Sequence, residues 1–501
     1  MIEATDGHAL VLVPKISNDL DRSAKSWEEI ELLKEYKSML ESKGREHVVA
    51  EALKCRSVRT LSDLIDNGVS IDITGPRRQN VLMLAAKWSD LAVVNFLYKH
   101  GYYSLDSRDS DGTSLVGVAA MSGNLEVLEW LHEQGLSLKT PNNERVTPLM
   151  MASRKGHSKV VKWLLLNKVE QDSVDEDGFG PVLWACLGGH LEVLKVLDGH
   201  GFDLSATDEE GTNGIILSAK QNKLEVLQWL VSRGVGLFHR NDEGSTAMTW
   251  AAERGHLDIM KWLFEQGCSL HDKTREGTSS IMYASSNGHL EVMQWMVANG
   301  CTADDSDEDG FTTIMWAAAE GHLNVLEWAY AIGCNLERRD KEGSNAAMFA
   351  SKLSQLRVLK WMQSHGCSLT GINLDGESCL HWAAKEAGEP TVLFLIEAGC
   401  SVDSKSESGT PLLLSANAGN LEVLKLLHRH GASLNPVDER WESPVIQAVC
   451  EGHLSVLQYL VRNGCSPFEL LYYGETLFQA AIGKGHLIIA NWLREITGLE
   501  A

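Results

Sequence analysis

One interval, the 33 residues between Gly178 and Gly211, recurs along most of the chain. It relates two series of glycines: Gly178, Gly211, Gly244, Gly277, Gly310, Gly343 and Gly376, and Gly234, Gly267, Gly300, Gly333, Gly366 and Gly399. A fixed period of this length is typical of an array of one supersecondary unit. Such a unit cannot bury its apolar face alone, so stacked neighbours must share a continuous core.

Residues 307–339 (DEDGFTTIMWAAAEGHLNVLEWAYAIGCNLERR) show what one unit contains. The opening Asp-x-Asp-Gly predicts a turn, because aspartate bonds nearby backbone and glycine accepts positive φ. The threonine that follows predicts the N-cap of a helix over 313–320, which Gly321 ends. Apolar residues at helical spacing predict a second helix over 322–332, ended by Gly333. The unit is therefore a turn, a helix, a turn and a second helix.

Three stretches closely resemble the ankyrin repeat, whose signature is T-P-L-H-x-A at this period: GTPLLLSANAGNLEVLKLLHRHGASL (409–434), VTPLMMASRKGHSKVVKWLLLN (146–167) and CLHWAAKEAG (379–388). The resemblance covers nearly all of residues 44–501 and gives about 14 repeats when the final glycine of each unit is counted. It implies an all-α ankyrin-repeat solenoid of stacked helix-turn-helix units with hairpin-like turn tips. Residues 1–43 are expected to form a tail and a short helix that caps the first repeat.

Three places depart from the repeat pattern. The stretches 211–227 and 344–359 lack the Gly-His pair that opens the second helix in most other repeats, and the interval from Gly399 to Gly431 is one residue short. Stability in a repeat array is close to a sum of local and nearest-neighbour terms. We therefore expect these three places to be the least stable parts of the array.

The composition indicates a folded protein and argues against a polyanionic partner. Hydrophobic residues make up 44% of the chain and charged residues 23%, as in ordinary globular proteins. The formal net charge of −23 disfavours nucleic acid and anionic membranes as partners and favours a basic protein surface. No apolar run is long enough to suggest a membrane span.

Motifs for catalysis are missing from the sequence. It contains no phosphate-binding GxxxxGK[ST], no HExxH and no GxSxG. We therefore expect no enzymatic activity, no catalytic residues and no cofactor.

The stretch DDSDEDGF begins like a calcium-binding loop, with aspartates at alternate positions before a glycine. A loop starting at Asp305 would need a bidentate glutamate at its twelfth position, where this chain has Trp316. Gly310 also belongs to the 33-residue series, whether or not acids surround it. We therefore expect no metal site and interpret the acids as a turn tip, with weak cation binding by Asp305, Asp307 and Asp309 as the alternative.

A ladder of histidines stands at the start of the second helices. Its members are His157, His190, His256, His289, His322, His453 and His486. Packed helices lie about 10 Å apart, whereas catalysis needs unlike groups within hydrogen-bond reach. We expect a structural role in which each ring bonds local backbone.

Five of the ten cysteines also follow the period. They are Cys268, Cys301, Cys334, Cys367 and Cys400. The spacing of the repeats excludes disulfides along this ladder, because bridged Cα atoms lie within about 7 Å. We expect compact, buried, free thiols, which fit a reducing compartment. The protein is accordingly expected in the cytoplasm, with the nucleus as the alternative.

Tryptophans form two further ladders, at positions that correspond to the inter-helix core of ankyrin-like units. The ladder on the first helices is Trp184, Trp250, Trp316 and Trp382, and that on the second helices is Trp130, Trp163, Trp229, Trp262, Trp295, Trp328 and Trp361. We expect both ladders to be buried packing residues rather than a platform for sugars or bases.

The resemblance implies that ligand contacts come from the turn tips and from the residue pair before Gly-His, on a concave face. The tips of this chain are acidic, and residues 170–210 hold eleven acids and one lysine. The preceding segment, 139–168, holds seven bases and one acid. Charges on a helical face usually mean only a solvated surface, and we expect this for the junction; the alternative is a partner with complementary charge blocks.

Three aromatic residues are candidate anchors. Phe179 and Phe311 each follow a turn glycine, and Trp441 stands where such a glycine is expected, so all three should be exposed. The complete set of candidate contacts is Arg154, Lys155, Glu176, Asp177, Phe179, Asp242, Glu243, Glu308, Asp309, Phe311 and Trp441.

Together these features predict a non-catalytic, monomeric scaffold or adaptor. Its partners would be one or more proteins with a basic and partly apolar surface. The alternative is a substrate-recruiting subunit of a multi-subunit enzyme such as a ubiquitin ligase. That role would need a docking segment at a terminus, and the helix expected over 26–43 is short and charged.

Overall fold

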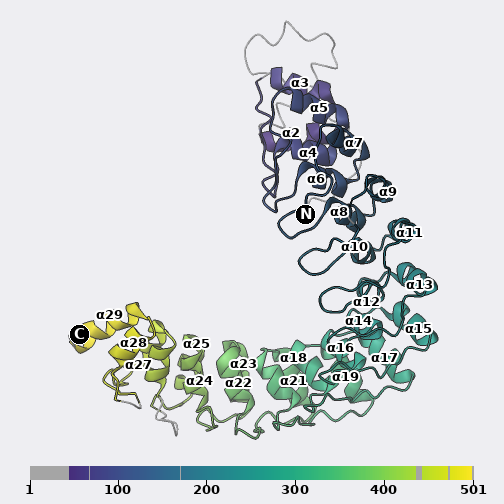
Figure 1. Cartoon of the computed structure of the whole chain (residues 1–501). Coiled ribbons are helices and arrows are strands. Elements are labelled where there is room, and N and C mark those ends of the chain that lie inside the picture. The colour runs from purple at the N-terminus through teal and green to yellow at the C-terminus, as the bar shows by residue number, and fades with distance from the viewer. Residues whose placement is uncertain (1–43, 67, 170, 436–442, 472–473, 499–501) are drawn as a thin grey trace, which may run out of the picture. The chain divides into compact units, whose positions relative to one another are not determined.

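The computed structural model describes residues 44–66, 68–169, 171–435, 443–471 and 474–498 (Figure 1). The chain divides into two compact units, unit 1 (Met1–Asp242) and unit 2 (Glu243–Ala501). The helix expected over 26–43 and the candidate residue Trp441 lie outside the described residues. Each unit is a succession of helix pairs, one pair to a repeat.

Unit 1 contains the helices α2 to α13. The first helices of its pairs are α2 (Arg45–Lys54), α4 (Val81–Trp88), α6 (Leu115–Ser122), α8 (Pro148–Lys155), α10 (Pro181–Gly188) and α12 (Gly214–Lys220). The second helices are α3 (Val58–Asp66), α5 (Leu91–Lys99), α7 (Leu125–Glu133), α9 (Ser158–Leu166), α11 (Leu191–Gly199) and α13 (Leu224–Ser232).

Unit 2 contains the helices α14 to α29. The first helices are α14 (Ala247–Glu253), α16 (Ser280–Ser286), α18 (Thr313–Glu320), α20 (Ala346–Lys352), α22 (Cys379–Glu386), α24 (Pro411–Asn417), α26 (Pro444–Cys450) and α28 (Leu477–Gly483). The second helices are α15 (Leu257–Glu265), α17 (Leu290–Ala298), α19 (Leu323–Ala331), α21 (Leu356–Ser364), α23 (Glu389–Glu397), α25 (Leu421–Arg429), α27 (Leu454–Arg462) and α29 (Leu487–Thr497).

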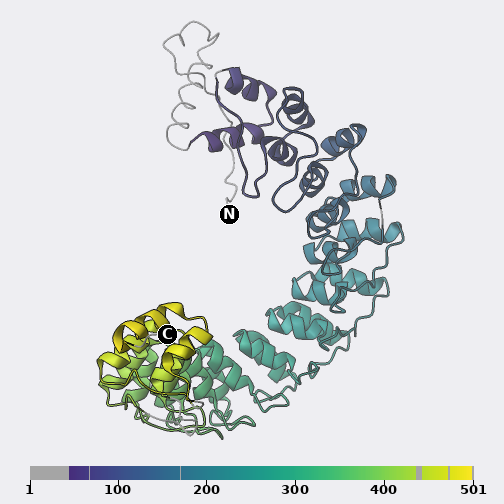
Figure 2. The ribbon, with the colours of Figure 1, turned by 60° about the vertical axis from the view of Figure 1, so that its left-hand side comes forward.

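Within each unit the helices form two layers. In unit 1 the first helices α4, α6, α8 and α10 lie side by side in one layer, and their partners α5, α7, α9 and α11 lie in the other (Figure 1). Figure 2 shows the stacked pairs of each unit from another side. Each first helix packs against its own second helix and against the first helices of neighbouring repeats. This is the all-α stack that the repeat period predicts.

The two layers differ in burial, and the sequence explains why. In α4 every residue from Val81 to Ala86 is buried, because neighbouring helices cover this helix on several sides. The second helices bury one side only, as α13 does with Val226, Leu227 and Leu230. Continuously apolar first helices and amphipathic second helices are therefore what two-layer stacking requires.

The repeat 307–339 follows its predicted boundaries closely. Thr312 Oγ1 accepts a hydrogen bond from the backbone N–H of Met315 at 3.2 Å and caps α18, which begins at Thr313. Gly321 closes α18 in the left-handed conformation, with φ of 81°. The predicted helices 313–320 and 322–332 correspond to α18 and to α19 (Leu323–Ala331).

The turn tips are hairpin-like, as predicted. Isolated antiparallel bridges join the two sides of each of these tips in the described residues: Arg108 and Ser114, Thr207 and Asn213, Lys273 and Ser279, Ser306 and Thr312, Arg339 and Asn345, Ile372 and Ser378, and Leu470 and Thr476. The tips therefore project from the first helices as short, internally bonded loops.

Candidate functional site

The first acid of a turn tip serves the tip itself. Asp175 is buried, and its Oδ1 accepts hydrogen bonds from the backbone N–H of Asp177 at 3.1 Å and of Phe179 at 2.8 Å. Asp307 bonds Asp309 and Phe311 in the same way, at 3.0 and 2.8 Å. Aspartate therefore recurs at this position for the structure of the turn.

The next two residues of a tip present their side chains to solvent. Their backbones join neighbouring tips: the N–H of Glu176 bonds the carbonyl oxygen of Glu144 at 3.2 Å, and Glu209 bonds Asp177 at 3.2 Å. The side chains of the candidate acids are exposed in each unit, namely Glu176, Asp177 and Asp242 in unit 1 and Glu243, Glu308 and Asp309 in unit 2. The tips that carry these acids thus combine backbone hydrogen bonds between neighbours with exposed negative charge.

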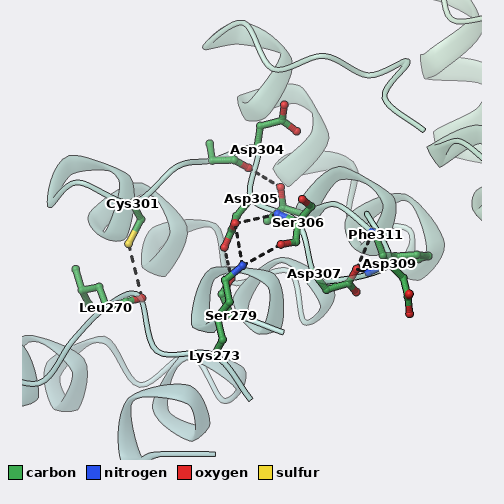
Figure 3. A network of polar contacts seen from close by, with 12 residues as sticks. Leu270, Lys273, Ser279, Cys301, Asp304, Asp305, Ser306, Asp307, Asp309 and Phe311 are labelled. Carbon is green, nitrogen blue, oxygen red and sulfur yellow. Dashed lines mark hydrogen bonds and ion pairs between the residues drawn. The ribbon is translucent and has the colours of Figure 1, made fainter. Parts of the chain in front are cut away.

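Figure 3 shows the stretch that begins like a calcium loop. Asp305 accepts a hydrogen bond from Ser279 Oγ at 2.6 Å and lies 3.4 Å from Lys273 Nζ. Asp307 is held by its own turn, and the side chain of Asp309 points outward, 90% exposed, 3.7 Å from Lys341 Nζ. In the described part of the chain, no group of three or more histidine, cysteine or acidic residues is placed to hold a metal ion.

Phe179 is half-buried, which corrects the prediction that its side chain is exposed. Its ring centroid lies 5.4 Å from that of Trp184, because the residue after the turn glycine folds back onto the first helix. Trp184 donates its indole N–H to Asp175 Oδ2 at 2.9 Å. The guanidinium of Arg154, from the preceding repeat, lies 4.6 Å from the centroid of the Trp184 ring. The structure therefore joins Arg154 and Phe179 around one tryptophan.

Phe311 is also half-buried, for the same reason. Its centroid lies 4.8 Å from that of Trp316 and 4.3 Å from that of Phe349, and Phe349 lies 5.0 Å from Trp382. We call these four rings the aromatic row. Lys352 Nζ lies 5.7 Å from the Trp382 centroid and adds a cation at its end. The row runs over the first helices of three consecutive repeats of unit 2.

The tryptophan ladders do not lie in the inter-helix core, which corrects a second prediction. Every member of both ladders is half-buried. On the second helices, tryptophans meet an aromatic side chain of the preceding repeat edge-on, as Trp130 does with Tyr98 at 5.5 Å and Trp295 with Phe264 at 5.7 Å. The small residues and branched aliphatics fill the core, and the indoles cover its two edges.

The histidine ladder is structural, but it does not bond local backbone as predicted. His157 Nε2 donates to the carbonyl oxygen of Met121, and His322 to that of Ser286, in the preceding repeat. Gln355 occupies the same position and its Nε2 bonds Ala319 O at 2.9 Å. These side chains therefore link successive repeats rather than stabilise one turn.

The cysteine ladder is largely buried, as predicted, although Cys334 is half-buried. Burial raises the pKa of Cys268, Cys301, Cys367 and Cys400 to about 11. Thiols with so high a pKa carry almost no thiolate at neutral pH and react slowly. None of the ten cysteines forms a disulfide in the described structure.

Sequence reasoning missed several exposed apolar residues. Leu374 lies on a turn tip and is 77% exposed, where other tips carry a polar or charged residue such as Glu308 or Lys341, and Phe238 is 68% exposed. The signal for Leu374 in the sequence was an apolar residue at a tip position that is polar in the other repeats. The predicted contact Lys155 lines a cavity of unit 1. Arg77 and Lys87, which line the same cavity, were not among the predicted contacts.

In the part of the chain that the structure describes, no helix combines the length and the apolarity that crossing a bilayer requires.

Comparison with known proteins agrees with this geometry. No curated protein matches the chain. The family model described as ankyrin repeats (3 copies) matches residues 47–142, 116–208, 183–274, 268–340, 314–406, 380–469 and 412–499. Because these matches together cover almost the whole array, the chain belongs to the ankyrin repeat family.

Proposed function

We propose that the chain is a non-catalytic scaffold or adaptor that binds partner proteins through the turn tips and first helices of its units. Ankyrin repeats are in general protein–protein interaction modules. The single observation that carries the proposal is the juxtaposition of half-buried aromatic rings with exposed tip carboxylates. Such rings receive apolar or cationic side chains, and the carboxylates attract positive charge.

The chemistry of these surfaces suits a basic, partly apolar partner. In unit 1 the exposed Glu176 and Asp177 lie next to Phe179, which rests on Trp184. In unit 2 Glu308 and Asp309 lie next to Phe311 and the aromatic row. Exposed charges mainly steer association and contribute to specificity, whereas aromatic anchors carry most of the affinity.

Affinity purification of the full chain, followed by mass spectrometry, tests the proposal and identifies the partner. Phe179→Ala and Phe311→Ala should weaken binding of a purified partner about tenfold or more, because each removes an anchor. Phe264→Ala is the matched control, since Phe264 is exposed and lies on the second helix α15, outside the turn tips and first helices. Equal affinities for all three variants would overturn the placement.

The charge contribution is tested separately. Glu176→Lys with Asp177→Lys should slow association and reduce its dependence on salt. Glu126→Lys, on the exposed side of α7, provides the control for a charge change elsewhere in unit 1. An unchanged association rate for the tip variant would contradict a basic partner at this tip.

We also propose a monomer in a reducing compartment, the cytoplasm or the nucleus. A reducing compartment is supported by the ten cysteines, none of which forms a disulfide in the described structure. Light scattering of the purified chain checks the oligomeric state, and cell fractionation checks the location. A stable dimer would refute the proposed monomer, and recovery of the chain from an oxidising compartment would refute the proposed location.

A further inference from the structure

A cavity of about 400 Å³ lies in unit 1 at the C-terminal turns of three neighbouring first helices, α4, α6 and α8. Its lining includes Arg77, Lys87, Trp88, Met121, Lys155 and His157. We call it the basic pocket. The residues come from three consecutive repeats, so the pocket exists only when these repeats are stacked.

The cations of the basic pocket arrive from separate elements. Arg77 precedes α4, Lys87 lies in the last turn of α4, and Lys155 lies in the last turn of α8. Among the described residues that line the pocket, none carries a carboxylate. Arg77 is paired with Asp111 at 3.2 Å, while Lys87 and Lys155 form no ion pair with any described residue. Two lysines therefore face the pocket without a negative partner.

The mutual proximity of these cations has a measurable consequence. Burial lowers the pKa of Lys87, and the charges of Arg77 and Lys155 lower it further. Like charges held close together repel one another, and a bound anion would relieve that repulsion. The packing of the repeats keeps the three groups close despite this cost.

Compensation of helix dipoles is the structural alternative, because lysines near helix C-termini stabilise the terminal carbonyls. Four other first helices also end with a lysine, namely Lys54 of α2, Lys220 of α12, Lys352 of α20 and Lys385 of α22, so the dipole accounts for a lysine at this position. Two of these lysines have an acidic partner, since Lys54 lies 2.6 Å from Glu51 and Lys352 lies 3.8 Å from Glu386. The basic pocket differs because its two lysines face one cavity and no described residue of its lining carries a carboxylate.

We propose that the basic pocket binds an anionic side chain of a partner protein, either a carboxylate or a phosphorylated residue. The half-buried indole of Trp88 and the Met121 side chain add an apolar wall, which fits a side chain better than a free ion. A chain with a net charge of −23 repels acidic segments in general, so the pocket would select them locally. The inference rests on the proposed protein-binding function and gives unit 1 a contact of opposite sign to the tips.

Fluorescence anisotropy with three short labelled peptides and the full chain tests the pocket. The peptides share one sequence and carry glutamate, phosphoserine or glutamine at the same positions. We expect saturable binding of the glutamate or the phosphoserine peptide, and the tighter of the two identifies the anion. Lys87→Gln with Lys155→Gln should weaken that binding about tenfold or more. Lys162→Gln, an exposed lysine of α9, is the matched control and should bind as the unchanged chain does.

Binding of the glutamine peptide as tight as that of the charged peptides would overturn the inference, as would equal losses for the pocket and control variants. Urea unfolding of each variant establishes that a loss of binding is not a loss of folding. If the purified partner depends on Phe179 and Phe311 but not on the two lysines, the pocket inference fails and the proposed function stands. If the acidic peptide requires the lysines and no partner requires the aromatic anchors, the proposed function fails instead.

Discussion

His157 Nε2 lies 3.0 Å from the carbonyl oxygen of Met121, a residue 36 positions earlier in the chain. The same ring covers Gly123, where an added Cβ would come within 2.5 Å of His157 Nδ1. One side chain thus satisfies a carbonyl at the end of α6 and occupies the space above the glycine that ends this helix. In the repeats that carry a Gly-His pair, the pair therefore makes contacts between repeats: the histidine covers the glycine of the preceding repeat, as His157 covers Gly123, and the glycine is covered by the next histidine, as Gly156 is by His190.

Two substitutions of His157 distinguish the contribution of its hydrogen bond to stability from that of its ring. His157→Ala leaves the Met121 carbonyl without its donor and should lower the free energy of unfolding by about 1 kcal/mol. His157→Gln keeps an N–H donor, as Gln355 does at the equivalent position, and should retain most of the stability. Urea denaturation followed by circular dichroism measures both variants. A glutamine variant as unstable as the alanine variant would show that the bond is not the source of the stability.

The same histidine makes stability depend on pH. Burial lowers the pKa of His157 below its usual value of 6.5, so the unfolded chain binds the proton more readily than the folded chain. Its contribution is fully present above pH 6.5 and is lost as the pH falls through the lower folded-state pKa. NMR titration of the His157 ring should give a midpoint below 6.5, and His157→Gln should reduce the loss of stability on acidification. A midpoint at or above 6.5 would contradict the burial argument.

Asn222 stands where most repeats have the glycine that precedes the second helix, and its φ of 56° is in the left-handed region. Asn222→Gly should raise the free energy of unfolding by about 0.5 kcal/mol, because glycine adopts this conformation without steric cost. Asn222→Ala should lower it, since alanine has neither that freedom nor a short polar side chain. Local hydrogen exchange across α12 and α13 is the measurement. Faster exchange in the glycine variant would show that the left-handed conformation of Asn222 does not weaken this repeat.

The buried thiols should resist alkylation. Burial raises the pKa of Cys186 and of Cys379 to about 12, so almost no thiolate is present at neutral pH. Iodoacetamide followed by peptide mass spectrometry should leave both residues unmodified in the native chain and modify them in urea. Rapid labelling of the native chain would mean that the repeats around these cysteines open readily.

The aromatic row should behave as one coupled group. Phe349 contacts both Phe311 and Trp382, so Phe349→Ala removes two ring pairs at once. A double-mutant cycle with Phe311→Ala should give a coupling energy of about 1 kcal/mol, the usual value of an aromatic pair. Urea unfolding of the two single variants and the double variant supplies the cycle. Strict additivity would show that the two rings do not stabilise each other.

Much of the local structure followed from short stretches of sequence. The helix over 313–320, the Thr312 cap and the turn role of Asp307 depend on residues within a few positions of one another. Hydrogen bonds of this range are set by residue type and by the conformations that the backbone allows. The period then determined that such units stack, because none of them can bury its apolar face alone.

Contacts between repeats were decided by the tertiary structure. Phe311 lies against Phe349, and Arg154 over Trp184, because stacking brings together residues about one repeat apart. Sequence reasoning therefore predicted that Phe179 and Phe311 follow the turn tips, but it predicted the wrong exposure for them and the wrong burial for the tryptophans. The basic pocket likewise has no local sequence signal, since Arg77, Lys87 and Lys155 meet only when three repeats pack together. Turn and helix follow from neighbours along the chain, whereas the exposure of a ring or the environment of a charge depends on the repeats packed beside it.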